Sequence, residues 1–543
     1  MRAAFHRVFL SAVVSGLALL VTSIAAQDIS TADVAAGLAN PARWLTYSGD
    51  YTGQRHSPLT QVTPANVGQL SAQWTFQTGI SGHKFEATPI VIDGVMYVTG
   101  PLNAAWAIDA RTGRQIWRHQ RTLPAQSELK VCCGFVNRGF AVYRDRLLMT
   151  TLDGHLVALD TKSGKVLWDV EMGDHKLGHA STVAPLIVKD KVIVGIAGGE
   201  FAIRGFLDAY DPMDGKRLWR FWTVPAAGEP GSETWPAEVW QRGGGPTWLT
   251  GTYDPELNLI YWGTGNPNPD FYGADRKGDN LYTNSLIAID ADKGTIRWHY
   301  QFTPHDEHDW DANQIPVLAN LSIGGQARKV VMLANRNGFF YVLDRADGKF
   351  IHAKPFVEQT WAKEIAADGR PVEIPEQRPT ATGTRTCPDL FGGTNFMSPS
   401  YNPATGLFYV TARETCMVYL SAAPPATTKM GDRTMGGSMR PVAGGTGALR
   451  AIDPVTGARK WEIAHPTPSW AGVLSTAGGV VFSGTNEGHI FAADAASGKE
   501  LWRYQLGAAI YAPPTTFMVD GRQYVVMPSG STLTAFALPA QPK

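Results

Sequence analysis

This chain of 543 residues has no charge imbalance and few cysteines. Lysine and arginine together number 48, as do aspartate and glutamate, and no basic or acidic run stands out. This balance argues against nucleic acid or an anionic membrane as the main partner. Only four cysteines occur, and none lies in a CxxC metal knuckle or a CxxCH haem-attachment motif. Two disulfides are the economical interpretation of an even number in an oxidising compartment.

Long apolar runs are also scarce, and the one that could cross a bilayer lies near the N-terminus. Arg2 and Arg7 precede the run, and small residues close it before Gln27. This order is typical of a secretory signal peptide over residues 1–26, with an uncleaved membrane anchor as the alternative. We therefore expect export, a mature chain over residues 27–543, and no membrane span after the signal is removed.

Helical patterns are weak, whereas 57 glycines and 35 prolines indicate many turns. One phrase recurs: Ala-x-Asp, a short turn that ends in glycine, and a tryptophan four residues after the glycine. The apolar residues before the aspartate alternate as in a strand, and the glycine supplies the left-handed position of a hairpin turn. Copies of the phrase end at Trp117, Trp168, Trp219, Trp298, Trp461 and Trp502, and a copy that begins at Val342 lacks the tryptophan.

The spacing of this phrase predicts the architecture. The copies recur at about 40–55 residues apart from two longer gaps, and each unit holds about four strand-like runs. The gap between Asp344 and Asp453 fits two units, so seven copies imply eight. We therefore expect an all-β fold, an eight-bladed β-propeller with tryptophan-docking repeats over residues 27–543. A parallel β-helix is the alternative, although its period should be much shorter. Inserted loops are expected at about 225–250, 265–283, 352–386 and 421–445.

The repeat does not require the adjacent pair Cys132-Cys133. Neighbouring Cα atoms lie about 3.8 Å apart, closer than the usual disulfide range of about 4.4–6.8 Å. A bridge between them would close a strained eight-membered ring. The alternative is a pair of buried small side chains that never bond.

Three further features also fall outside the repeat. Glu200 follows a pair of glycines and is expected at the end of a strand. Trp248 ends the motif GGGPTW, and Asn266 lies in GTGNPNPD. Residues 304–313, PHDEHDWDAN, concentrate acidic side chains in a chain that is otherwise sparing with charge. Taken singly, these could be a bulge, a packed ring, an ordinary turn and a solvated loop.

Together, the vicinal cysteines, the repeat and these motifs resemble the quinoprotein alcohol dehydrogenases, propeller enzymes that use pyrroloquinoline quinone (PQQ). The resemblance covers nearly the whole mature chain. It implies that the planar cofactor lies in the central channel between a Cys132–Cys133 disulfide ring and Trp248. It also implies further cofactor contacts from Glu86, Arg138, Thr182, Gly198, Gly199, Arg336, Asn395 and Trp470. Ala197 and Pro246 depart from the pattern, since some relatives carry a hydroxyl there.

The same resemblance implies a metal site and a catalytic base. Glu200, Asn266 and Asp309 match the family's metal ligands, and Asp309 matches its base. Asp311 faces the same way as Asp309 if the segment is extended, because side chains then alternate with a period of two. An aspartate there resembles the lanthanide-using members, since a trivalent ion gains from one more anionic ligand. The alternative is a calcium enzyme in which Asp311 is an exposed acid.

The function implied is oxidation of a small primary alcohol to the aldehyde in the periplasm. A separate soluble cytochrome c is the expected electron acceptor, because this chain carries no haem-attachment motif. A homodimer is possible, and the resemblance implies a second, structural disulfide between Cys387 and Cys416. Two alternatives stay open: a PQQ-dependent sugar or polyol dehydrogenase, and a non-catalytic periplasmic propeller scaffold.

Overall fold

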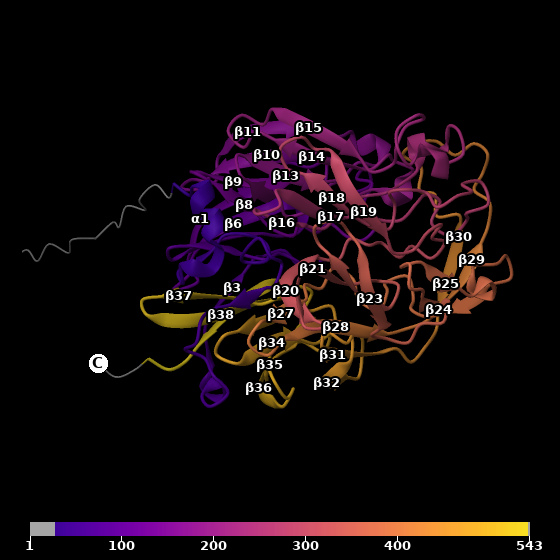
Figure 1. Ribbon diagram of the computed structural model, residues 1–543. Coiled ribbons are helices and arrows are strands. Elements are labelled where there is room, and N and C mark those ends of the chain that lie inside the picture. Colours follow the sequence, from indigo (N-terminus) through magenta and orange to yellow (C-terminus); the bar gives the residue numbers. More distant parts are fainter. Residues whose placement is uncertain (1–27, 541–543) are drawn as a thin grey trace, which may run out of the picture.

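Nearly all of the regular structure is β-strand (Figure 1). The computed structural model describes residues 28–540, so the predicted signal peptide lies outside the described residues. One short α-helix, α1 (Thr31–Ala36), opens this region, and only brief 3-10 turns accompany the strands. The all-β prediction is confirmed. Between residues 28 and 540, no helix is long and apolar enough to cross a membrane.

Eight sheets of four or five strands account for most of residues 28–540. The first four sheets are β1 (Arg43–Trp44) with β4 (Ile90–Ile92), β5 (Val95–Thr99), β6 (Ala104–Asp109) and β7 (Gln115–Gln120); β8 (Ala141–Tyr143), β9 (Arg146–Thr150), β10 (His155–Asp160) and β11 (Val166–Glu171); β12 (Leu186–Val188), β13 (Lys191–Gly195), β14 (Phe206–Tyr210) and β15 (Arg217–Trp222); and β16 (Thr252–Asp254), β17 (Leu259–Gly263), β18 (Ser285–Asp290) and β19 (Ile296–Gln301). The other four are β20 (Val317–Ile323), β21 (Gln326–Ala334), β22 (Phe339–Asp344) and β23 (Phe350–Pro355); β27 (Ser400–Asn402), β28 (Leu407–Glu414), β31 (Thr446–Ile452) and β32 (Arg459–His465); β2 (His56–Ser57) with β33 (Leu474–Thr476), β34 (Val480–Gly484), β35 (His489–Asp494) and β36 (Glu500–Gln505); and β37 (Thr515–Val519), β38 (Arg522–Ser529) and β39 (Thr532–Ala537) with β3 (Ser71–Gln77).

Burial changes across each sheet from one edge to the other. The second strand is almost wholly buried, as in β5 and β9, whereas the fourth is largely exposed, as in β11, where exposed and half-buried positions follow one another. This gradient is typical of sheets packed face to face, with the fourth strand at the rim.

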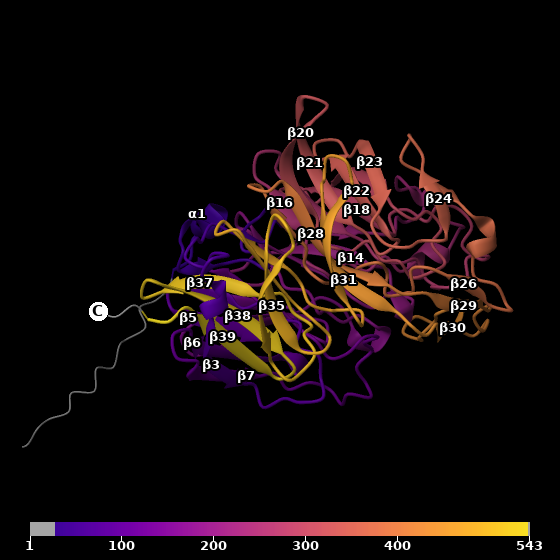
Figure 2. The same ribbon diagram turned by 90° about the horizontal axis from the view of Figure 1, so that it is seen from below.

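The two ends of the chain meet in one sheet. Strand β3, near the N-terminus, pairs antiparallel with β39, the last strand, so the final sheet combines distant segments. Strand β2 likewise joins β33 of the preceding sheet. Figure 2 shows indigo β3 lying beside yellow β37, β38 and β39. This pairing ties the first and last sheets together.

In most copies of the phrase the tryptophan packs on the phrase glycine of the next sheet, and Trp74, which lies outside the phrase, does the same, whereas Trp502 packs on Phe536. Trp74 of β3 lies against Gly113, and Trp117 of β7 lies against Gly164. A Cβ added at Gly113 would come within 2.8 Å of the Trp74 ring, so the close approach requires glycine. The indole nitrogen of Trp117 also donates to the Thr161 carbonyl at 2.9 Å. The phrase therefore specifies contacts between sheets as well as a hairpin within one.

The copy without tryptophan uses the same position differently. His352 stands where the indole is expected, and its Nε2 lies 2.9 Å from the Pro454 carbonyl. The ring also approaches Gly457, the phrase glycine of the next sheet. A histidine thus replaces the tryptophan contact there.

We predict that Trp117→Ala lowers the free energy of unfolding by about 3 kcal/mol, as expected for removal of a buried aromatic ring. The substitution also leaves the Thr161 carbonyl without its indole donor. Leu167→Ala is the matched control, because Leu167 is 46% exposed on β11 and its loss should change stability by at most about 0.5 kcal/mol. Thermal unfolding at one scan rate compares the two, and equal midpoints would contradict the role given to the indole.

Two segments predicted to be inserted loops contain strands. Residues 352–386 include the pair β24 (Ala362–Ile365) and β25 (Pro371–Glu373), and β26 (Thr384–Thr386) joins β29 (Met417–Ser421) and β30 (Gly437–Pro441) in a small sheet. These strands are short and belong to no repeat, so no periodicity revealed them. The expected disulfide Cys387–Cys416 connects the ends of β26 and β29. Within 225–250 and 265–283, the structure has loops and 3-10 turns, as expected.

Candidate active site

A cavity with about 840 Å³ of empty space, part of it open to solvent, collects side chains from distant parts of the chain. Most of its walls come from loops that connect different sheets, and residues 197–200 and Arg336 add loops within a sheet, so the cavity lies where the sheets converge. Glu200, Asp309 and Asp311 reach the cavity, whereas Asn266 does not line it directly. The cavity also takes in every residue predicted to contact the cofactor: Glu86, Cys132, Cys133, Arg138, Thr182, Gly198, Gly199, Trp248, Arg336, Asn395 and Trp470.

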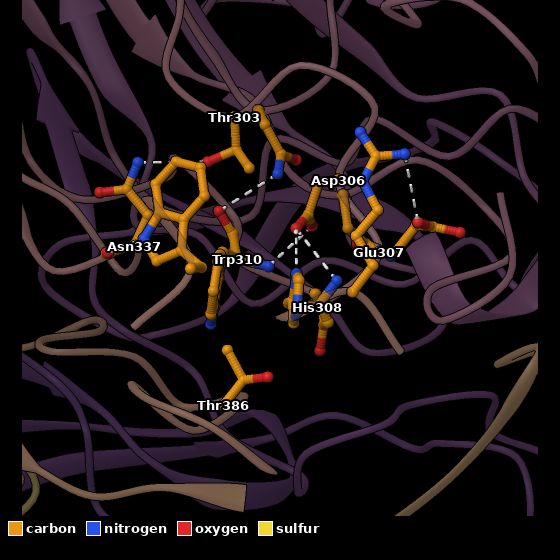
Figure 3. Close-up of polar contacts among 12 residues, drawn as sticks. Thr303, Asp306, Glu307, His308, Trp310, Asn337 and Thr386 are labelled. Atoms are coloured by element: carbon orange, nitrogen blue, oxygen red, sulfur yellow. Dashed lines mark hydrogen bonds and ion pairs between the residues drawn. The ribbon is translucent and has the colours of Figure 1, made fainter. Parts of the chain in front are cut away.

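The acidic segment at 304–313 divides into a structural and a cavity-facing half. The Asp306 carboxylate accepts the backbone N–H groups of His308 at 3.0 Å and Trp310 at 2.9 Å (Figure 3). The His308 ring stacks on Trp310 with centroids 4.2 Å apart. Glu307 accepts the backbone N–H of Gly273. The hydrogen bonds of these carboxylates stabilise the loop, and the His308 ring packs against Trp310 instead of binding a metal.

Asp309 and Asp311 occupy the cavity-facing half, although not on an extended strand as predicted. Asp309 has a φ of 63°, in the left-handed region that side chains other than glycine rarely adopt. Both carboxylates nevertheless line the same cavity. Arg336 holds the pair, because one of its nitrogens donates to the Asp309 carbonyl at 2.7 Å and another lies 3.1 Å from Asp311 Oδ2. The buried Oδ1 of Asp309 has no hydrogen-bond partner among the described residues.

Asp311 anchors two neighbours of the cavity. Its Oδ1 accepts the backbone N–H of Asn266 at 2.6 Å, and its Oδ2 accepts the indole N–H of Trp248 at 2.8 Å. The residue is only 5% exposed, so the alternative of an exposed acid is wrong. Asp311 therefore fixes the orientation of the Trp248 ring.

Glu200 comes from a short 3-10 turn rather than from the end of a strand as predicted. Strand β13 ends at Gly195, and Glu200 lies in the turn Gly199–Phe201 that follows. A Cβ added at Gly199 would lie 2.8 Å from the amide oxygen of Asn266, so glycine lets this oxygen sit beside the turn. The glycine pair thus brings the Asn266 amide next to Glu200.

Burial raises the pKa of Glu200 and of Asp309, and the nearby Asp311 raises both further. Arg336 acts in the opposite direction but does not cancel these effects. Crowded, buried carboxylates with one unpartnered oxygen form the donor set that a hard cation needs. A bound cation would keep these carboxylates ionised near neutral pH.

Arg138 supplies a buried cation on another wall of the cavity. Its guanidinium is 2.7 Å from Glu86 Oε2 and donates to the Thr182 hydroxyl at 2.5 Å. The same group lies 4.9 Å from the ring centroid of Trp248. With Arg336 and Lys84, it makes a cavity that suits an anionic ligand with a flat face.

Trp470 and Asn395 complete the wall on the C-terminal side. Trp470 stacks on Phe396 at 5.5 Å with an interplanar angle of 11°, and the Arg413 guanidinium lies 4.0 Å from its ring centroid. The Asn395 amide donates to the Phe391 carbonyl at 2.9 Å. These contacts hold the Trp470 ring in place beside the cavity.

Cys132 and Cys133 form a disulfide, and the described residues contain no free cysteine. We predict that the denatured, unreduced protein incorporates no alkyl group and that the reduced protein incorporates four, one at each cysteine. Peptide mass spectrometry after iodoacetamide treatment measures both states. Alkylation of Cys132 or Cys133 before reduction would remove the disulfide surface from the site.

Sequence reasoning missed two polar residues near the site. Lys84 lines the cavity but lies in no motif, so nothing in the sequence distinguishes it. Asp270 lies beyond the cavity wall and hydrogen-bonds to Asn266. Its place in GNPNPD was a usable signal, since a carboxylate so close to a predicted metal ligand can orient it.

Comparisons with known proteins agree with this geometry. Residues 44–372 match the family described as "Glucose/ethanol/alcohol dehydrogenase, beta-propeller domain", and residues 445–538 match the outer membrane protein assembly factor BamB. The chain is 40% identical to the quinoprotein alcohol dehydrogenase PedH of Pseudomonas putida, over 94% of this chain and 90% of that protein. It is 38% identical to the lanthanide-dependent methanol dehydrogenase of Methylacidiphilum fumariolicum, over 90% of this chain and 85% of that one.

Solved structures give the same result. A europium-containing methanol dehydrogenase superposes with a TM-score of 0.88 at 34% identity. The superposition covers 93% of this chain and 100% of that one. The quinohemoprotein alcohol dehydrogenase ADHIIG of Pseudomonas putida gives a TM-score of 0.89 at 36% identity, covering 95% of this chain and 83% of that one. The β-propeller fold expected from the repeat is confirmed.

Proposed function

The chain belongs to the family of PQQ-dependent alcohol dehydrogenases, and on that basis we propose that it oxidises a primary alcohol to the aldehyde in the periplasm. The resemblance inferred from the motifs is confirmed, and the chain is an enzyme of this type. The observation that carries the proposal is the convergence of Glu200, Asp309 and Asp311 on the cavity lined by the vicinal disulfide and Trp248.

The residues of the cavity fit PQQ. The cofactor is flat and carries three carboxylates, so it needs planar surfaces and cations. Trp248 and the Cys132–Cys133 disulfide would provide the surfaces, while Arg138 and Arg336 would hold the anionic edge. When bound, the quinone supplies the acceptor for the two electrons released by the alcohol.

The oxygen-rich side of the cavity fits one metal ion. Glu200, Asn266, Asp309 and Asp311 would hold it with hard oxygen donors. Three carboxylates around one ion favour a trivalent lanthanide, with Ca²⁺ as the alternative. A relative of this chain is named as a lanthanide-dependent methanol dehydrogenase, which supports this preference.

Asp309 is the proposed catalytic base. Its buried carboxylate would accept the hydroxyl proton of the alcohol, because the unpartnered Oδ1 can take that hydrogen bond. Arg336 would keep the carboxylate in place through the Asp309 carbonyl, since the guanidinium donates there at 2.7 Å. The buried surroundings exclude water from the reacting groups.

The N-terminal pattern and the two disulfides support a periplasmic location, and a soluble cytochrome c is the proposed electron acceptor.

We also propose that the eight large sheets are the eight blades of one domain over residues 27–543, docked through their tryptophans, and that the enzyme forms a homodimer. The sheet order and the tryptophan–glycine contacts support the blade count.

A substrate screen tests the proposal. The purified chain is loaded with PQQ and either La³⁺ or Ca²⁺, and dye-linked oxidation is measured across primary alcohols, polyols and sugars. We expect primary alcohols to react fastest, with La³⁺ ahead of Ca²⁺. Faster turnover of sugars or polyols would favour that alternative, and no turnover of any substrate by the loaded protein would favour a non-catalytic scaffold.

A further inference from the structure

A carboxylate outside the predicted ligand set lies directly behind Asn266. Asp270, four residues further along the chain, is fully buried at 0% exposure. Its Oδ1 accepts the amide N–H of Asn266 at 2.7 Å. Its Oδ2 is buried and has no hydrogen-bond partner among the described residues. A buried carboxylate with a free oxygen is costly unless a positive charge lies nearby.

Within residues 28–540, no cationic side chain donates a hydrogen bond to this carboxylate. The charge of the buried Arg276 lowers the pKa of Asp270, yet the guanidinium nitrogens donate elsewhere, to the carbonyls of Pro269 and Asp306 and to the Asn280 side chain. Glu200 and Asp311 instead surround Asp270 with further negative charge. Among the described residues, Asp270 therefore has neither an ion pair nor a hydrogen bond from a cationic side chain, and the neighbouring acids outnumber the one nearby guanidinium.

The Asn266 amide is oriented by the same contact. Its nitrogen donates to Asp270 Oδ1 and, at 3.2 Å, to the Pro267 carbonyl. With the nitrogen committed to that side, the amide oxygen turns towards Gly199, beside Glu200. A neutral acceptor at position 270 could hold the amide, but only a carboxylate also adds charge.

We propose that Asp270 is a positioning residue, because it fixes the Asn266 oxygen towards the metal. Asp270 is also a fourth carboxylate at the site, and its charge favours a trivalent ion over a divalent one. This inference rests on the metal site of the proposed function. A buried charge behind the ligands attracts a trivalent ion more strongly than a divalent one, because the Coulomb energy scales with the ion's charge. Residues that orient metal ligands typically change metal affinity by about 10–100-fold when they are replaced.

Terbium luminescence measures the effect without any turnover. Trp248 donates to Asp311 at 2.8 Å, so its indole lies close enough to the proposed site to sensitise bound Tb³⁺. The purified full chain is stripped of metal and titrated with Tb³⁺, with and without PQQ, and Ca²⁺ is then titrated in competition. Asp270→Asn keeps the shape and the acceptor, and Asp275→Asn is the matched control at an exposed acid in the same loop.

We expect Asp270→Asn to weaken Tb³⁺ binding about 10–100-fold and Ca²⁺ binding by a smaller factor, so that the preference for Tb³⁺ falls. Asp275→Asn should behave as the unmodified chain does. If Asp270→Asn does not fold, Asp270→Ser is measured in the same way. An unchanged ratio of Tb³⁺ to Ca²⁺ affinity would overturn the proposal, as would absence of Tb³⁺ binding by the unmodified chain.

The readout separates this inference from the proposed function. The titration involves no alcohol, so an unchanged metal preference in the variant can coexist with full alcohol oxidation by the unmodified chain. Conversely, an unmodified chain that fails to oxidise any alcohol can still lose its Tb³⁺ preference when Asp270 is replaced.

Discussion

Asp309→Asn is expected to lower kcat for alcohol oxidation by about a thousandfold, within the range for loss of a general base. An amide cannot take the hydroxyl proton, whereas the carboxylate offers a buried Oδ1 that has no hydrogen-bond partner among the described residues and lies 3.8 Å from an Arg336 nitrogen. Burial and the charges of neighbouring acids raise the pKa of Asp309, and the proposed cation beside it would favour the ionised carboxylate. The backbone contact with Arg336 does not involve the replaced group and should survive.

Steady-state kinetics with an artificial dye measure this effect, with metal and quinone contents determined for each preparation. Glu307→Gln is the matched control in the same segment, because an amide oxygen can still accept the Gly273 N–H. The control should retain nearly full activity. A loaded Asp309→Asn enzyme with kcat within tenfold of the unmodified enzyme would remove Asp309 from the role of base.

Asp311→Asn should have the second largest effect, a loss of about a hundredfold or more in La³⁺-supported kcat/KM, since both a ligand charge and a ligand orientation change. The two oxygens of Asp311 accept N–H groups from Asn266 and Trp248, and Arg336 approaches the second oxygen. An asparagine has only one oxygen, so its amide nitrogen must face a donor. Activity with Ca²⁺ should fall less, because a divalent ion gains less from the lost charge.

Parallel assays with La³⁺ and Ca²⁺ test this expectation, and Asp311→Ala extends it by removing both acceptors. The ratio of the two activities separates metal preference from general damage to the site, since a misplaced Trp248 would affect both metals alike. Equal La³⁺-supported activity in the variants and the unmodified enzyme would show that Asp311 does not select the metal.

The architecture could be predicted from the sequence because the same contact between a tryptophan and a glycine recurs between neighbouring sheets. A glycine that accepts a tryptophan ring from the neighbouring sheet must recur wherever that contact recurs, as at Gly113 and Gly164. The first such tryptophan, Trp74, was missed because its strand completes the last sheet and lies outside the phrase. The strands β24 and β25 were missed because they occur once and follow no period.

The site was less predictable than the fold, since its geometry comes from irregular backbone. Local alternation suggested an extended segment at Asp309, but the structure places this residue in the left-handed region. Glu200 was expected at a strand end and lies in a 3-10 turn. Asp270 shows the limit most clearly, because only the folded structure reveals that one of its oxygens is buried without a partner.

A crystal structure of the enzyme grown with PQQ and a lanthanide, with diffraction recorded at the lanthanide absorption edge, tests the central claim most directly. The account predicts one strong anomalous peak bounded by oxygens of Glu200, Asn266, Asp309 and Asp311, at about 2.3–2.6 Å from each. A lanthanide peak elsewhere, with these four side chains left without metal, would contradict it.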